Sequence, residues 1–516
     1  MSTRRWALGF AALSLLAACQ TNAPHVQDAP RAAPAQRASS DDVALLDRLS
    51  FGATPTSAAE MTRMGQQAWV ERQLHPSHGA ALPPAIQAQV GAMTISQTPL
   101  PDLVRNLDAQ RKSADAIADD DQKKTAQQQY QQELNRLTRE ASSRMLLRAL
   151  YSPNQLQEQM TWFWFNHFNV HQYKSNIRVL VGDYEEKLRT HSLGRFRDLL
   201  QASVFHPAMV RYLDNEQNAA ARINENYARE LLELHTLGVD GGYTQRDVQE
   251  LARVLTGLGI NFNDDTPKMK PDKQAFYVRR GLVEFNPNRH DFGDKQVLGA
   301  TIHGRGIAEI EQVLDTLARH PSTARFVSRK LAQYFVSDTP PAALVDRMSR
   351  RFLETDGRIA EVMRTMIDSP EFRQSLGGKF KDPVHYVVSA VRLAYDDKPI
   401  LNTGPMLNWL NRLGEAPYNR QTPDGYPLDE MAWAGPGQMN TRFEVARAIG
   451  GGSAGLFKTE GAMPTERPAF PQLANPLYYD GIAPRLAVTT RQALDQANSP
   501  QEWNALLLSS PEFMHR

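Results

Sequence analysis

Residues 155–173 constrain the fold more than any other segment, because as a helix they would be apolar on nearly every side. The segment carries Met160, Trp162, Phe163, Trp164, Phe165 and Phe168. A helix without a polar face must be covered all round, so it should lie at the centre of a large fold. Apolar residues also recur at helical spacing through most of residues 41–516. We therefore expect a mainly α protein with a large multi-helix globular fold.

Two stretches depart from this pattern. Between about 260 and 305, short runs rich in β-branched and aromatic residues flank a glycine, as at 276–279 and 282–285. Such runs are typical of strands, so we expect a small β-hairpin or sheet insertion near 275–303. Within a long helical candidate over 103–151, the polar stretch 108–132 has no lasting apolar heptad. It predicts a solvated arm or an exposed hairpin.

The first residues carry targeting information. Arg4 and Arg5 precede an apolar stretch over 6–18 that is too short to cross a membrane and fits a secretory signal peptide. The stretch ends in Leu-Ala-Ala before Cys19, which resembles the lipobox of bacterial lipoproteins and implies lipidation of that sulfur. An ordinary signal peptide with an incidental cysteine is the alternative. Cys19 is the only cysteine, so it has no disulfide partner within the chain.

The residues after Cys19 predict a location and a domain plan. Gln20 follows the cysteine, and by resemblance to lipoprotein sorting signals this favours the outer membrane over the inner membrane. We expect a signal peptide over 1–18, a lipidated flexible tether over 19–40 and one large helical domain over 41–516, in which a C-terminal subdomain could begin at about 379. The 58 basic and 57 acidic residues nearly balance, so the chain has no global basic bias and we expect no nucleic-acid partner.

The densest group of reactive side chains lies between 224 and 238. On a regular helix Asn226, Arg229, Glu230 and Glu233 share one face, and His235 lies on the opposite side. Two carboxylates one turn apart can bind a cation or divide into an acid and a base. The alternative is a solvated face with an Arg229–Glu233 pair.

Weaker candidates lie elsewhere in the chain. His167 and His171 would stack one turn apart on a helix, a spacing that suits a transition metal as well as a purely structural pair. The segments 288–293, which contains Asp291, and 422–427 also read as turns. A divalent metal is one open alternative. Its candidate ligands are His167, His171, Glu230 and Glu233.

Several blocks resemble one known family. The run "NENYARELLELHTLGVDGGYTQRDVQELARVLTG" from Asn224 is similar to the signature block of the bacterial family catalogued as domain of unknown function 1800. The runs "LLDRLSFGATPTSAAEMTRMGQQAWVERQL", "MTWFWFNHFNVH" and "TPDGYP" are similar to further blocks, so the resemblance covers roughly residues 43–510. It implies a largely helical, exported protein without implying a reaction. It draws attention to the block positions Asn224, Glu225, Asn226, Arg229, Glu230, Glu233, His235, His167 and Asp291.

Two functions are compatible with these features. One is an extracytoplasmic hydrolase of an envelope or extracellular polymer, in which Glu230 and Glu233 act as acid and base or bind metal, and His167 and Asp291 converge on them. In this hypothesis the binding residues are Asn224, Glu225, Asn226, Arg229 and His235. The other is a non-catalytic surface protein that binds glycan or a protein partner, with the polar cluster as a buried structural network. An open site would favour the enzyme, and a closed, fully paired network would favour the scaffold.

Overall fold

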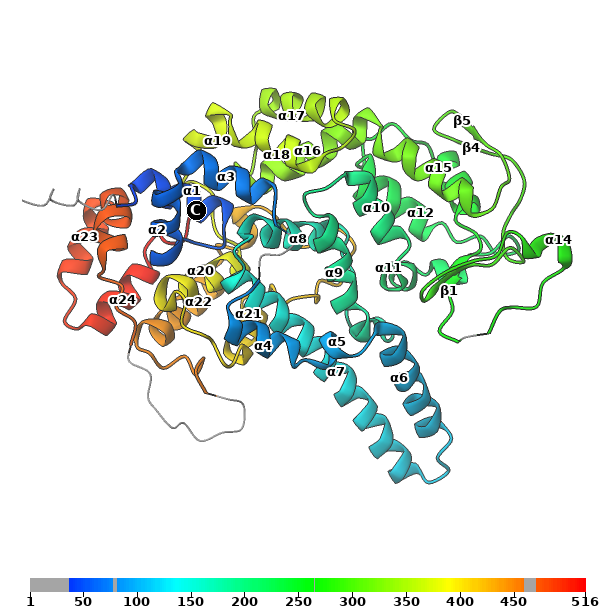
Figure 1. The fold of residues 1–516 in the computed structure, drawn as a ribbon, viewed down its shortest axis with the longest axis horizontal. Coiled ribbons are helices and arrows are strands. Elements are labelled where there is room, and N and C mark those ends of the chain that lie inside the picture. The colour runs from blue at the N-terminus through cyan, green and yellow to red at the C-terminus, as the bar shows by residue number, and fades with distance from the viewer. Residues whose placement is uncertain (1–36, 78–80, 264, 459–469) are drawn as a thin grey trace, which may run out of the picture. The chain divides into compact units, whose positions relative to one another are not determined.

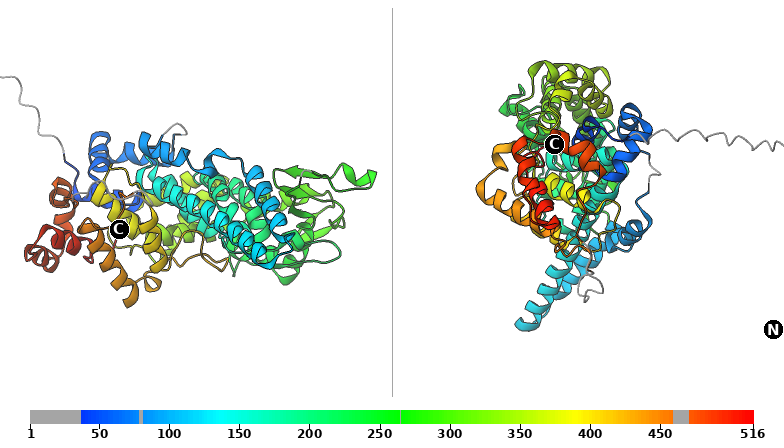
Figure 2. Two further views of the ribbon diagram at one scale, coloured as in Figure 1. Left: turned by 90° about the horizontal axis from the view of Figure 1, so that it is seen from below. Right: turned by 90° about the vertical axis from the view of Figure 1, so that its left-hand side faces the viewer.

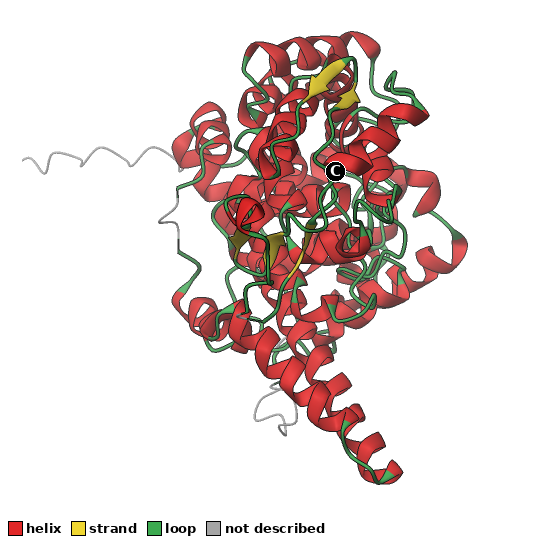
Figure 3. Cartoon of the chain, turned by 90° about the vertical axis from the view of Figure 1, so that its right-hand side faces the viewer, coloured by secondary structure: helices red, strands yellow, loops and turns green. Residues whose placement is uncertain are grey.

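Helices joined by short turns carry the chain through most of its length (Figure 3). A computed structural model describes residues 37–77, 81–263, 265–458 and 470–516. The expected signal peptide, Cys19 and nearly all of the expected tether lie outside these residues. Residues Arg37–Arg516 form one compact unit. The predicted mainly α class is confirmed.

The first helices begin at side-chain caps. Ser39 and Asp42 form a reciprocal capping box at the start of α1, and Thr54 and Ser57 form another before α2, where Pro55 takes the first helical position. The helices before the aromatic segment are α1 (Ser40–Leu49), α2 (Pro55–Met64), α3 (Gln66–Leu74), α4 (Pro84–Gly91), α5 (Thr94–Gln97), α6 (Leu100–Asp115) and α7 (Asp120–Tyr151).

Helices α6 and α7 form a hairpin that projects from the other helices (Figure 1). Residues 116–119 interrupt the predicted long helix, and the side chain of Asp119 caps the second helix by accepting the backbone N–H of Gln122. The outer halves of both helices are polar and exposed, whereas the inner half of α7 is largely buried. The expectation of an exposed hairpin within 108–132 is thus confirmed.

The aromatic segment forms α8 (Gln155–His167), and every side chain in it is buried. It packs against α1, α3, α7 and α9 (Val181–His191), as predicted for a central helix. The helix ends at His167, so the predicted stacking of His167 and His171 one turn apart is wrong. The reason is a tertiary contact, because the Asn169 amide donates to the carbonyl oxygens of Arg420 and Thr422 at 3.0 and 2.8 Å.

The chain on either side of α9 forms short helical pieces. One of them, η3, is a π-helix that directly extends α12. The pieces of this region are η1 (Ile177–Val179), α10 (Phe196–Val204), α11 (Pro207–Tyr212), η2 (Asn215–Gln217), α12 (Asn226–Glu230), η3 (Leu231–Thr236) and α13 (Gln245–Val254).

The strands are short and antiparallel. They form one sheet in the order β1-β3-β2 and a separate β4-β5 hairpin. The elements are β1 (Leu258–Ile260), α14 (Pro271–Gln274), β2 (Val278–Arg280), β3 (Val283–Phe285), β4 (Lys295–Val297) and β5 (Ala300–Ile302). The predicted insertion near 275–303 is confirmed, and β1 adds a strand that the sequence did not predict. The strands and the last helices lie at opposite ends of the unit (Figure 2).

The last part of the chain returns to helices. Segments of this part contact the early ones, as η5 does with α1 and as α20 and α21 do with α7. The helices are α15 (Ile307–Ala318), α16 (Pro321–Phe335), α17 (Ala342–Glu354), α18 (Ile359–Ile367), α19 (Pro370–Gln374), α20 (Pro383–Tyr395), α21 (Gly404–Arg412), η4 (Glu430–Ala432), α22 (Pro436–Gly450), η5 (Tyr478–Ile482), η6 (Ala483–Arg485), α23 (Val488–Asp495) and α24 (Pro500–Leu508).

Candidate functional site

The candidate site is built on α12 and the π-helix η3. The backbone N–H of Leu237 donates to the carbonyl of Leu232 at 2.8 Å, and the Thr236 hydroxyl donates to the carbonyl of Leu231 at 2.7 Å. Both bonds span five residues, which is the π-helical spacing. Short π segments are rare and often occur at functional sites. The widened turn places Glu233 near the surface and buries His235 completely.

Glu230 is the least constrained acid of the site. Its side chain is half-buried, and among the described residues no hydrogen bond or ion pair reaches its carboxyl group. Burial raises the pKa of Glu230, and the like charges of Glu233 and Asp424 raise it further, whereas Arg229 lowers it. The pKa of Glu230 therefore lies above that of an ordinary glutamate, so its carboxyl group keeps a proton to a higher pH than a solvated one does.

Glu233 lies in a paired environment. Arg229 Nη1 lies 3.5 Å from Glu233 Oε1, so the predicted Arg229–Glu233 pair is present, and Arg229 Nη2 binds Glu225 at 3.3 Å and Gln245 at 2.8 Å. Burial together with the neighbouring Glu233 carboxylate raises the pKa of Tyr243 to about 12. Glu230 and Glu233 therefore differ in their surroundings although they lie on one helix.

Asn224 and Asn226 hold the start of α12. The side-chain oxygen of Asn224 accepts the backbone N–H of Asn226 at 3.0 Å, and its amide donates to the carbonyl of Asp214. The Asn226 amide donates to the carbonyl of Leu213 at 3.2 Å. Both amides are therefore engaged in positioning the helix. Asp214, which precedes the helix in a left-handed turn, binds Lys174 at 2.8 Å.

Two buried histidines lie behind the acidic face. His167 Nε2 is 3.0 Å from the carbonyl oxygen of His235, and the two ring centroids are 6.2 Å apart. Among the described residues, no hydrogen-bond partner reaches Nδ1 of His167 or either ring nitrogen of His235. Burial lowers the pKa of both, that of His235 to about 3, and the positive charge of Lys330 lowers them further. Both imidazoles are therefore neutral at pH 7.

Two distant segments complete the site. Lys330 on α16 is partly buried, and desolvation lowers its pKa to about 8, which the charge of Asp424 partly opposes. Asp424 lies on the 422–427 turn and binds Arg420 at 3.0 Å. The turn packs closely against Asn166 of α8, because Gly425, at φ +78°, has no Cβ that would overlap this residue. The side-chain oxygen of Asn166 accepts the backbone N–H of Tyr426. Lys330 was not predicted from the sequence, whereas 422–427 was predicted as a turn from its residues and also resembles a family block.

These segments all fall within one family match. The family described as a protein of unknown function (DUF1800) matches residues 44–515. The chain belongs to this family. No curated protein and no solved structure matches the chain. The match to DUF1800 includes α8, α12, η3, α16 and the 422–427 turn, so all parts of the site lie in the family's shared region.

Asp291 and His171, which were predicted for the site of this DUF1800 protein, make their contacts away from the acidic helix. Asp291 binds Arg253 Nε at 2.7 Å and accepts the backbone N–H of Gly293 at 2.9 Å, and the Arg253 bond lowers the pKa of Asp291. In the described part of the chain, no hydrogen bond or ion pair joins Asp291 to Glu230 or Glu233. His171 lies beyond the end of α8, with its ring 5.6 Å from that of Tyr173.

The described residues of this DUF1800 protein contain no group of three or more His, Cys, Asp or Glu side chains that could hold a metal ion. The four predicted ligands, His167, His171, Glu230 and Glu233, therefore do not gather into one ligand set there. No helix within the described ranges combines the length and apolar character needed to cross a membrane.

Proposed function

We propose that this DUF1800 protein is an exported, lipid-anchored hydrolase that cleaves an envelope or extracellular polymer, with Glu230 as the general acid. The observation that carries the proposal is the contrast between two acids on one helix. Glu230 has no partner among the described residues and a raised pKa, whereas Glu233 is bound by Arg229 and lies near Tyr243. Such a contrast is how enzymes obtain an acid and a base from two carboxyl groups.

The remaining residues take supporting roles in this proposal. Glu233 is the carboxylate partner of Glu230, as base or nucleophile, and Arg229 and Tyr243 fix its position. His167 and His235, neutral and buried, are positioning residues that hold η3 against the end of α8. Lys330 and Asp424 set the local charge. The half-exposed position of the acidic face suits a chain-like substrate that lies across the surface.

The sequence supports the proposed location at the outer membrane. Lipidation at Cys19 would hold the protein at a membrane, and Gln20 favours the outer membrane. Hydrolysis consumes only water, and it therefore suits a compartment that lacks ATP and reduced nicotinamide.

One observation favours the alternative of a non-catalytic surface protein that binds glycan or a protein partner. Arg229 is shared among Glu225, Glu233 and Gln245, which is the paired network expected of a scaffold. In that alternative the acidic face contacts a ligand without changing it.

The test measures release of soluble fragments from isolated envelope polymers by mass spectrometry. Glu230→Gln and Glu233→Gln should each reduce the rate at least about 100-fold, as expected for loss of a general acid or base. Glu430→Gln is the matched control, because Glu430 is exposed and its side chain has no partner among the described residues. Wild-type rates in both site variants would refute the proposal. Polymer binding without product from the wild-type protein would favour the alternative.

A further inference from the structure

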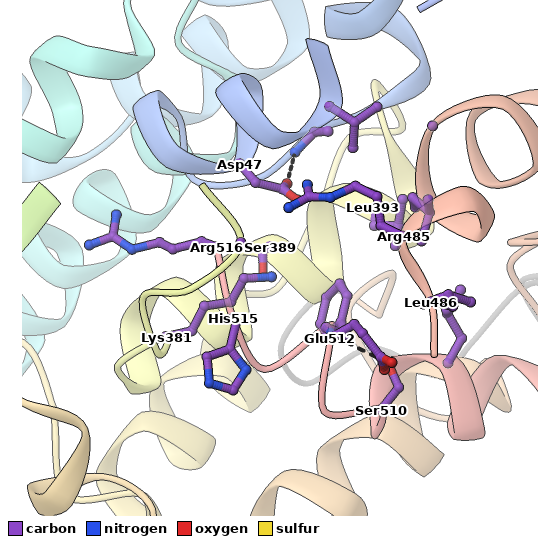
Figure 4. A pocket seen from close by; sticks show the side chains of 17 residues that line it. Asp47, Lys381, Ser389, Leu393, Arg485, Leu486, Ser510, Glu512, His515 and Arg516 are labelled. Atoms are coloured by element: carbon purple, nitrogen blue, oxygen red, sulfur yellow. Dashed lines mark hydrogen bonds between the residues drawn. The ribbon is translucent and has the colours of Figure 1, made fainter. Parts of the chain in front are cut away.

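A second site of a different kind lies far along the chain from the acidic helix. A cavity of about 110 Å³ opens between α1, α20 with the segment before it, η5, η6 and the end of the chain from α24 onward (Figure 4). We call it the C-terminal cavity. None of its lining residues belongs to the candidate hydrolase site. Its walls combine apolar side chains, such as Leu393, Leu486 and Phe513, with cationic ones.

The most unusual lining residue is Lys381. Its side chain is 2% exposed, and its Nζ lies 3.9 Å from the centroid of the Phe513 ring. Among the described residues, no acceptor hydrogen-bonds to this ammonium and no carboxylate pairs with it. Burial lowers the pKa of Lys381 to about 8, so the group is still mostly protonated at pH 7. The side chain is buried while its ammonium borders the cavity, so the free donors can bind an acceptor that enters from outside the chain.

The second free cation is Arg485, which is exposed at the cavity wall. It forms no hydrogen bond or ion pair within the described residues, yet its charge acts on Lys381. Gly377, at φ +78°, makes room for it, because a Cβ at this position would overlap the Arg485 guanidinium. The backbone is thus shaped around the guanidinium.

The other charged groups of the cavity are already occupied. The Arg516 guanidinium binds Gln159 at 3.1 Å and His385 at 2.8 Å. Asp47, whose charge partly offsets that of Lys381, accepts the backbone N–H of Ala53 at 2.8 Å. Glu512, the other acid of the lining, accepts the backbone N–H of Ala487 and the hydroxyl of Thr490. Both acids thus have hydrogen-bond donors, whereas Lys381 and Arg485 have no acceptor among the described residues, and the ligand that complements these two cations is an anion.

The apolar walls and the volume narrow the choice of anion. A cavity of roughly 150 Å³ lined by aliphatic side chains can hold benzene, so about 110 Å³ suits a body of several carbon atoms. A guanidinium fork matches a carboxylate, and an ammonium adds a second charged contact. We propose that the C-terminal cavity binds an aliphatic monocarboxylate of about four to six carbons, whose carboxylate contacts Lys381 and Arg485 and whose chain lies against Phe513.

Calorimetric titration of the purified full-length protein with pentanoate tests this proposal. Pentanoate should bind saturably at one site, whereas 1-pentanol and inorganic phosphate should bind at least about tenfold more weakly. The alcohol lacks the charge, and phosphate lacks the apolar body. Lys381→Met and Arg485→Gln should each weaken pentanoate binding about tenfold or more. Gly377→Ala should weaken it by displacing Arg485.

The matched control is Lys398→Met, because Lys398 also lies over a phenylalanine ring, at 4.2 Å from the Phe457 centroid, but outside the cavity. This variant should bind pentanoate like the wild type. Arg485→Gln changes an exposed side chain, so it keeps the test valid if Lys381→Met fails to fold. Absence of pentanoate binding, equal binding of phosphate, or unchanged binding in the Arg485 variant would overturn the proposal.

Discussion

Replacement of His235 by phenylalanine should make the protein more stable, and increasingly so as the pH falls. His235 is fully buried beside Phe168 and His167, and no described residue is a hydrogen-bond partner of either ring nitrogen. A phenyl ring keeps the aromatic contacts without burying unpaired polar atoms. Removal of such atoms is worth about 1–3 kcal/mol.

The pH dependence follows from the depressed pKa of His235. Burial lowers it from 6.5 to about 3, so between these values the unfolded chain binds a proton that the folded chain does not. The resulting loss of folding stability is absent well above pH 6.5 and grows as the pH falls toward 3. At pH 5 it amounts to about 2 kcal/mol. His235→Phe removes it, so the advantage of the variant should grow by about 2 kcal/mol from pH 7 to pH 5.

Urea unfolding at pH 7 and pH 5 measures both the stabilisation by His235→Phe and its increase at the lower pH. His303→Phe is the control, because the His303 side chain is 69% exposed, and it should show no growing advantage at the lower pH. The reasoning is refuted if the difference between His235→Phe and the wild type is the same at both pH values. Fragment release measured alongside should fall in His235→Phe if the ring serves the proposed hydrolase.

Three further changes have definite expected outcomes. Glu309→Ala should lower the free energy of unfolding by about 3–5 kcal/mol, because it leaves the fully buried Lys295 ammonium without its carboxylate. Gly425→Ala should loosen the 422–427 turn and speed its proteolysis, because a Cβ there would overlap Asn166 and the φ of +78° is strained for alanine. Cys19→Ser should move the protein from the membrane fraction to the soluble fraction, as judged by immunoblotting.

The paired control variants and the outcomes that would contradict these predictions are as follows. Glu354→Ala removes a carboxylate that is 64% exposed and should leave the urea midpoint nearly unchanged. Gly437→Ala adds a Cβ in open space within α22 and should not affect proteolysis of the turn. Equal stability of Glu309→Ala and the wild type, or unchanged membrane association of Cys19→Ser, would contradict the corresponding argument.

Local patterns predicted the helices well because their causes are local. The aromatic run of α8 and the Thr244–Asp247 capping box of α13 lie within a few residues of the structure that they specify. The end of α8 could not be predicted in this way. No glycine or proline follows His167 closely. The helix ends where Asn169 binds carbonyl groups about 250 residues further along the chain.

The candidate site was predictable only in part for the same reason. A regular helix places Glu230 and Glu233 on one face, and the Arg229–Glu233 pair agrees with that geometry. The approach of Lys330 and Asp424 depends on tertiary packing that no local pattern encodes. The C-terminal cavity is a stronger example, because it joins α1 to the end of the chain.

The π-helix makes the number of residues in 231–236 part of the geometry of the candidate site. Deletion of one residue there would restore regular α-helical spacing and turn His235 by about 100° relative to Glu230. The imidazole would then leave the interior, or the carboxyl group would leave the surface. Relatives that share this chemistry should therefore tolerate insertions and deletions in the α6–α7 hairpin, while the number of residues between Glu230 and His235 stays constant.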